Sequence, residues 1–138
     1  ERPMLSWLKS ILGGTPRARK IIDLEAKLLP AEGYVCDGDF EFEAYDNDDW
    51  SIEIEVDHNG RAPDGPWRVL VNGRQITEVT PSARHETEVH LRSDRDALNF
   101  QITEGMTVEL HNAKGVFLRC TLRYDTLRHA PTFIEAQP

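Results

Sequence analysis

The densest group of chemically capable side chains in this sequence is a run of carboxylates between residues 40 and 57. The run has no lysine or arginine, and its eight acids are Glu41, Glu43, Asp46, Asp48, Asp49, Glu53, Glu55 and Asp57. Its charge therefore equals the formal net charge of the whole chain, which is -8. Carboxylates at this density can bind a cation or attract a basic surface.

Calcium is the most natural cation for such a group, because it takes about six to eight oxygen ligands. Asp46, Asp48 and Asp49 are the acids closest together in the sequence. They lack the glycine and the distal glutamate of an EF-hand loop. These three residues are therefore an alternative calcium site, and no other cofactor is expected.

The histidines and cysteines offer few further arrangements. His85 and His90 in "HETEVH" are five residues apart, whereas the H-E-x-x-H zinc motif needs four. His90 and His111 point outward in the expected strands and would meet only if those strands were neighbours. Cys36 and Cys120 have inward positions, which predicts buried thiols packed as small apolar groups, with a mutual disulfide as the alternative.

The sequence contains no G-x-S-x-G elbow, no Walker loop and no dinucleotide-binding glycine motif. We therefore expect a non-catalytic protein, although loops 58–66 and 93–105 leave room for an active site built from loops. A pI of about 5.1 argues against nucleic acid as a partner, since phosphate binding needs a basic surface. The class that remains is a protein that binds other proteins or ligands.

The acidic run itself is predicted to be a β-hairpin, because apolar and acidic residues alternate on both sides of a turn. The alternation assigns Phe40, Phe42, Ile52, Ile54 and Val56 to the core. It assigns Glu41, Glu43, Glu53 and Glu55 to the outer face. Like charges opposite each other in a sheet cost about 0.2–1 kcal/mol, so a counterpart is expected.

Two counterparts for the outer glutamates can be named from the sequence. One is intramolecular, since four arginines have outward positions on other expected strands: Arg68, Arg92, Arg119 and Arg123. The other is a basic partner, for example a second copy of this chain. The first 30 residues have a net charge of +3, from Arg2, Lys9, Arg17, Arg19, Lys20 and Lys27 against Glu1, Asp23 and Glu25.

The remaining chain predicts an all-β domain. Further strands are expected at residues 20–29, 67–71, 74–80, 85–92, 106–111 and 116–123. Asn72-Gly73 is a strong signal for a two-residue hairpin turn. Together these elements predict an antiparallel sandwich or barrel of seven to eight strands.

The stretches "LEAKLLPAEG", "VLVNGRQITEV" and "EGMTVELHNAKGVFLRCTL" carry a resemblance to a known group of proteins. Residues 20–123 resemble small bacterial β-sandwich domains that are distantly similar to chordin-type (CHRD) domains. The resemblance implies a sandwich fold. It implies no reaction, ligand or site that can be assigned to residues of this chain.

The N-terminal stretch "MLSWLKSILGG" predicts a short amphipathic helix before the sandwich. Its apolar face consists of Leu5, Trp7, Leu8, Ile11 and Leu12. A helix this short needs a surface to pack on. We expect it to dock on a protein partner or a second copy, with its own domain or a membrane surface as alternatives.

The sequence thus divides into three parts. Residues 1–19 are expected to form the helix and a basic linker, residues 20–125 the sandwich, and residues 126–138 an irregular tail. No secretory signal is visible, which favours a cytoplasmic location, although a signal removed before residue 1 would leave no trace.

Overall fold

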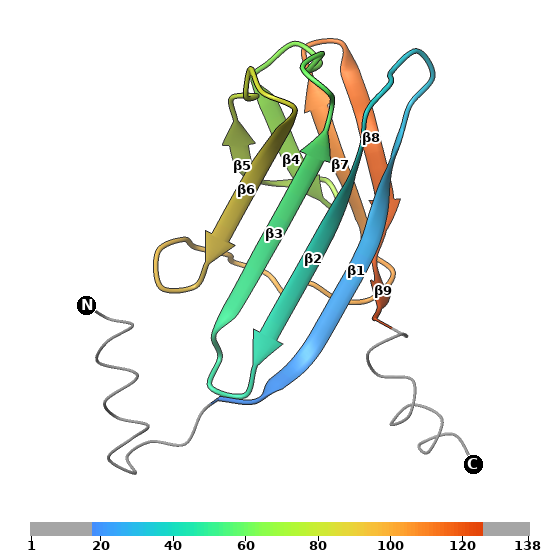
Figure 1. The fold of residues 1–138 in the computed structure, drawn as a ribbon. Helices are drawn as coiled ribbons and strands as arrows, with labels where there is room; N and C mark the ends of the chain where they lie inside the picture. Colours follow the sequence, from blue (N-terminus) through green and yellow to red (C-terminus); the bar gives the residue numbers. More distant parts are fainter. Residues whose placement is uncertain (1–17, 126–138) are drawn as a thin grey trace.

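The computed structural model describes residues 18–125 (Figure 1). These residues form nine antiparallel strands that are joined by turns and loops. No helix occurs in these residues, and hence none that is long and apolar enough to cross a membrane. The strands are β1 (Lys20–Pro30), β2 (Asp37–Tyr45), β3 (Trp50–Asp57), β4 (Trp67–Val71), β5 (Arg74–Val79), β6 (Glu86–Arg92), β7 (Thr107–Asn112), β8 (Gly115–Thr121) and β9 (Arg123–Tyr124).

The strands form two layers that share β1. Sheet A has the order β6-β3-β2-β1-β9, and sheet B has the order β5-β4-β7-β8, followed by the end of β1. Figure 1 shows β6, β3, β2 and β1 in front of β5, β4, β7 and β8. The strands form one continuous path from β5 to β6 that is nearly closed into a barrel. The barrel stays open between β5 and β6, because these two end strands do not pair with each other.

The alternation of side chains along each strand produces the core between these layers. In β3, Ile52, Ile54 and Val56 are buried, while Glu53 and Glu55 between them are exposed. The opposite layer contributes Val69, Val108, Leu110 and Phe117, all at most 1% exposed. Burying each such side chain stabilises the fold by about 1.5–3 kcal/mol.

Two local features hold β4 in place: the turn that follows it and the contacts of Trp67 at its start. Asn72 and Gly73 both have positive φ, 50° and 82°, as a type I′ turn between β4 and β5 requires. Trp67 lies with its ring centroid 5.1 Å from that of Phe117, and its Nε1 donates a hydrogen bond to the Pro63 carbonyl oxygen. These contacts fix the segment in which the chain crosses from sheet A to sheet B.

The predicted all-β, antiparallel architecture is confirmed, and each expected strand overlaps an observed one. The ninth strand, Arg123–Tyr124, is an addition: the expected strand at 116–123 is interrupted at Leu122. Cys36 and Cys120 are buried and unpaired, as the inward positions predict. The predicted helix with Leu5, Trp7, Leu8, Ile11 and Leu12, and the tail 126–138, lie outside the described residues.

Candidate functional site

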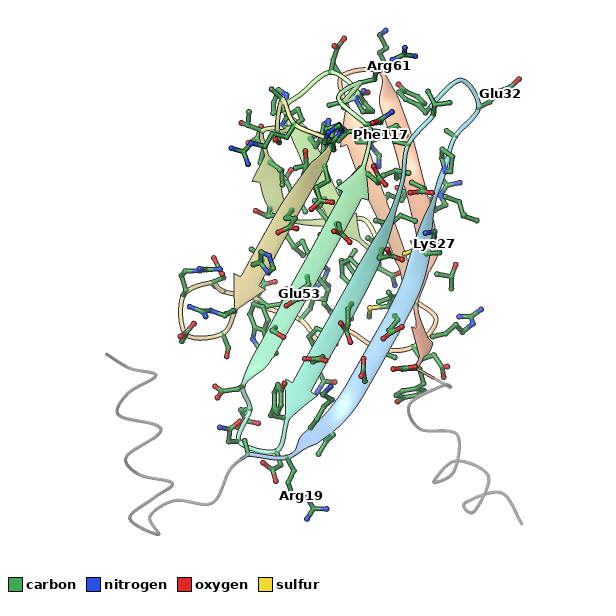
Figure 2. All side chains as sticks on the ribbon, in the orientation of Figure 1. Arg19, Lys27, Glu32, Glu53, Arg61 and Phe117 are labelled. Atoms are coloured by element: carbon green, nitrogen blue, oxygen red, sulfur yellow. The ribbon has the colours of Figure 1, made fainter. Side chains whose placement is uncertain are left out.

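The outer face of sheet A gathers acidic side chains from four adjacent strands. This acidic face consists of Asp23 and Glu25 of β1; Asp37, Asp39, Glu41 and Glu43 of β2; Glu53, Glu55 and Asp57 of β3; and Glu86 and Glu88 of β6. Figure 2 shows carboxylate oxygens across this face, with Glu53 near its centre. The four glutamates predicted from the hairpin pattern, Glu41, Glu43, Glu53 and Glu55, all lie on it.

The register of sheet A places these acids directly opposite one another. Seven cross-strand pairs are carboxylate against carboxylate: Asp23–Glu43, Glu25–Glu41, Asp37–Asp57, Asp39–Glu55, Glu41–Glu53, Glu55–Glu88 and Asp57–Glu86. Each such pair is destabilising relative to a neutral one. At these seven positions the sheet therefore lacks the stabilisation that opposite charges across neighbouring strands would give.

Basic side chains near the acidic face lie mainly along its edges. Lys20 Nζ lies 2.6 Å from Glu43 and 3.4 Å from Asp23, and Lys27 Nζ lies 3.9 Å from Asp39. The His90 ring reaches Glu53 at 3.8 Å and Glu88 at 3.5 Å. Arg123, one of the arginines expected as a counterpart, lies opposite Glu25 in the β1–β9 pair. Glu55 and Asp57 of β3 lie opposite acids on both neighbouring strands.

Two of the arginines proposed as intramolecular counterparts serve the other sheet instead. Arg119 binds Glu109 with its Nε at 2.9 Å and Nη2 at 2.8 Å, and Arg68 lies opposite Glu78. Both pairs belong to sheet B, because the strand order places β8 and β4 away from β2 and β3. The hypothesis that Arg68 and Arg119 neutralise the hairpin is therefore wrong.

The crowding of acids changes their protonation. Burial, together with Asp23 and Glu43 nearby, raises the pKa of Glu41 to about 8. A hydrogen bond with Glu88 and the charge of Glu55 raise the pKa of Glu86 to about 7. In contrast, Lys20 lowers the pKa of Glu43, against the opposing effect of burial. The charge of the acidic face therefore depends on pH near neutrality.

A shallow depression of about 250 Å³ lies in the middle of the acidic face. Its polar lining consists of Asp39, Glu41, Glu53, Glu55, Glu88 and His90. Ile54 of β3 also lines it, although the side chain of Ile54 faces the core. A cationic side chain placed here would meet carboxylates from three strands.

Three groups of carboxylates within residues 18–125 come close enough to share a cation. They are Asp23, Glu25 and Asp125; Asp23, Glu41 and Glu43; and Glu55, Glu86 and Glu88, each with ligand oxygens within 4.8 Å of one another. Hard cations such as calcium prefer oxygen ligands of this kind. The first two groups share Asp23, whose side chain is fully buried.

The alternative calcium residues Asp46, Asp48 and Asp49 do not form such a group in the structure. Asp46 Oδ1 accepts a hydrogen bond from the Arg19 amide, and Asp49 Oδ1 accepts one from Ser93 Oγ. Asp48 has a positive φ of 72° in the turn between β2 and β3. All three residues thus shape the hairpin turn.

One pair resembles a nucleophile and its base, but it is enclosed by the core. His58 Nε2 lies 2.8 Å from Thr87 Oγ1, with His58 at 1% and Thr87 at 3% exposure. Thr87 Oγ1 also accepts a hydrogen bond from the Ser82 amide. A substrate has no access to these atoms, so we interpret the pair as structural.

The other reactive residues are equally poorly placed for catalysis or metal binding. Burial raises the pKa of Cys120 to about 12 and also raises that of Cys36, which favours thiols over thiolates. His90 and His111 do not meet, because β6 and β7 are not neighbours. His85 instead contacts Asn59 Oδ1 at 3.2 Å.

Sequence reasoning missed part of the acidic face. Glu86 and Glu88 alternate with buried residues in β6, so the pattern that revealed Glu53 and Glu55 could have revealed them. No local signal identifies Asp23, which has an outward position in β1 and is nevertheless fully buried beside Glu43. Its burial depends on residues distant in the sequence.

Comparisons with known proteins give no family for this chain: it matches no protein-family model and no curated protein. The resemblance of residues 20–123 to CHRD-type β-sandwich domains stays a prediction. Function must therefore be inferred from the geometry of the acidic face.

Proposed function

We propose that this chain is a non-catalytic protein-interaction module whose acidic face docks a basic segment of a protein. The observation that carries the proposal is the set of seven carboxylate–carboxylate pairs across four strands. Natural sheets gain stability from opposite charges at such positions. A face that forgoes this gain at seven positions favours a cationic partner, in addition to the contacts that Lys20, Lys27 and His90 make with it.

The first candidate for that partner is the basic N-terminal segment of a second copy. The first 30 residues have a net charge of +3, whereas residues 40–57 carry -8. Within one chain, Lys20 already pairs with Glu43 and Asp23 at the edge of the acidic face. Attraction between opposite ends of neighbouring copies would produce self-assembly, with the apolar residues Leu5, Trp7, Leu8, Ile11 and Leu12 adding contact area.

A binding experiment with the full chain tests this proposal. The probe is a fluorescein-labelled peptide with the sequence of residues 1–20, and the readout is fluorescence anisotropy at 20 and 500 mM NaCl. We expect saturable binding at low salt that weakens strongly at high salt, because ions screen exposed charges. The double variant Glu53→Gln/Glu55→Gln should weaken binding at low salt by about tenfold.

The matched control is Glu32→Gln/Glu78→Gln, which removes two exposed carboxylates outside the acidic face. It has the same net charge as the test variant. If the two double variants bind the peptide equally, the net charge of the chain determines peptide binding. The proposal that the acidic face is the docking site would then be wrong. Sedimentation velocity of the full chain, wild type against Glu53→Gln/Glu55→Gln, then shows whether the same face drives self-association.

A further inference from the structure

A second surface of different character lies where β1 passes from sheet A to sheet B. A groove of about 850 Å³ opens there between β1 and the strand pair β8 and β9. β1 pairs with β8 at one end of the groove and with β9 at the other, in the same register. Leu29 pairs with Arg119, and Glu25, four residues earlier, pairs with Arg123, four residues later. The positions between, 26–28 and 120–122, do not pair with each other, although 26–28 pair with β2 and 120–121 with β7.

A continuous ladder would place Lys27 opposite Thr121 at the middle of this gap. The two strands separate instead, because one end of β1 follows β2 in sheet A while the other follows β8 in sheet B. The separation leaves a groove at the side of the sandwich. Open ladders of this kind expose backbone polar groups and apolar side chains together.

The floor of the groove is apolar. Ala26, Leu118 and Cys120 line it, and Leu118 is fully buried while Cys120 is 6% exposed. Leu29, at one end, is 61% exposed and adds apolar surface to the groove. Burial raises the pKa of the Cys120 thiol to about 12, so the floor carries no negative charge there.

The rim of the groove is basic, in contrast to the acidic face beside it. Lys27, Arg119 and Arg123 line the opening, against the single carboxylate of Glu25. Lys27 is exposed at the outer side of β1 in Figure 2. Arg119 also binds Glu109, and Lys27 lies 3.9 Å from Asp39, so both cations have a carboxylate partner outside the groove. The lining of the groove itself still has more cations than carboxylates, on a chain with a net charge of -8.

We infer that this groove binds a small carboxylate with an apolar chain, of the medium-chain fatty acid type. The volume lies within the range of about 300–1,000 Å³ that is usual for small-molecule sites. An apolar floor with a few charged groups at the rim matches a ligand with an aliphatic chain and an anionic head. Guanidinium and ammonium groups are the natural partners of a carboxylate.

The experiment is an NMR titration of the full chain with octanoate, with acetate and 1-octanol as comparison ligands. Acetate has the charge without the chain, and octanol has the chain without the charge. We expect octanoate to shift amide signals of residues 25–31 and 116–123 in a saturable way, octanol to do so more weakly, and acetate not at all. Octanol binding as tightly as octanoate would overturn the assignment of an anionic ligand.

Variants at the rim test the location. Thr121→Trp places a large side chain over the groove from an exposed position and should abolish the octanoate shifts. Lys27→Ala and Arg123→Ala should each weaken octanoate binding by about two- to fivefold, the range for one exposed ion pair. The matched control is Arg84→Ala, since Arg84 is exposed in the loop before β6, and it should leave binding unchanged.

Two results would overturn the inference. One is an amide shift pattern outside the groove. The other is unchanged octanoate affinity in Lys27→Ala and Arg123→Ala, both of which remove exposed side chains and leave the core intact. Neither result bears on peptide binding at the acidic face, because the two experiments use different probes and different residues.

Discussion

The outer faces of the two sheets follow opposite rules of charge pairing. On sheet B, Arg68 lies opposite Glu78 and Glu109 opposite Arg119. On sheet A, Glu41 lies between Glu25 and Glu53. One chain therefore contains both a conventional face and a repulsive one, on layers that share a core. The acidic pattern of sheet A is thus not a requirement of the fold.

The inner faces should show no such difference between the sheets. Ile54 of sheet A and Leu110 of sheet B are each 1% exposed in the shared core. Ile54→Ala and Leu110→Ala should each lower the free energy of unfolding by about 2–5 kcal/mol, through lost burial and the cavity left behind. Urea unfolding followed by tryptophan fluorescence measures both, with the exposed Glu53→Ala as control. A large loss from one sheet only would show that the two layers do not share one cooperative core.

The interior and the acidic face should also respond to acid in opposite ways. Burial lowers the pKa of His58, so its neutral form is favoured in the folded state. Its contribution to stability is therefore present above the unfolded pKa of about 6.5 and is lost as pH falls below it, by at most about 1.4 kcal/mol per pH unit. His58→Gln should remove this loss between pH 6.5 and 5, measured by urea unfolding at each pH. A loss of stability that is unchanged in His58→Gln would contradict the assignment.

Reversing one charge on each outer face tests the comparison directly. Arg119→Glu removes the contact with Glu109 and creates repulsion on sheet B, so it should lower the free energy of unfolding by about 1 kcal/mol. Glu53→Lys places a cation beside Glu41 and should raise it by about 0.5 kcal/mol. Urea midpoints at low salt measure both. If the two variants change stability in the same direction, the faces do not differ as the register implies.

The strands and the direction of their side chains could be predicted from the sequence, because they depend on neighbouring residues. The order of the strands in the two sheets could not. Alternation is local, so it identified β2 and β3 and the outward glutamates Glu41 and Glu53 from the residues alone. The pairing of β3 with β6, which adds Glu88 beside Glu55, joins strands that are separated in the sequence by β4, β5 and their loops. The outward position of Arg119 could likewise be predicted, but its place on sheet B, away from the hairpin, depends on strand order.

Proximity in sequence was equally misleading for the turn of the hairpin. Asp46, Asp48 and Asp49 are close along the chain, but the turn directs Asp46 to the Arg19 amide and Asp49 to Ser93. The groove between β1 and β8 had no sequence signal, because it arises where one strand divides between two sheets. The alternation of β1 breaks at this point, where the buried Leu28 is followed by the exposed Leu29, but the sequence does not show that a groove results.

The smallest expected effect concerns a single proton on the acidic face. Burial and neighbouring acids raise the pKa of Glu41 from 4.5 to about 8, so the folded state favours its protonated form. A raised carboxyl pKa means that stability is highest below pH 4.5 and falls as pH rises toward 8. Glu41→Gln mimics the protonated form and should remove this fall. Above pH 8, the variant should melt about 1–5 °C higher than wild type, as expected for relief of one repulsive contact.

Thermal melts at half-unit steps from pH 5 to 9 distinguish this effect from a general change in charge. Glu32→Gln removes one carboxylate from the loop between β1 and β2, away from the acidic face, and should follow the wild-type curve. Parallel curves for wild type and Glu41→Gln would mean that Glu41 is ionised at neutral pH without cost. In that case the carboxylates of sheet A would be solvated independently, and their alignment across four strands would no longer distinguish this face from the outer face of sheet B.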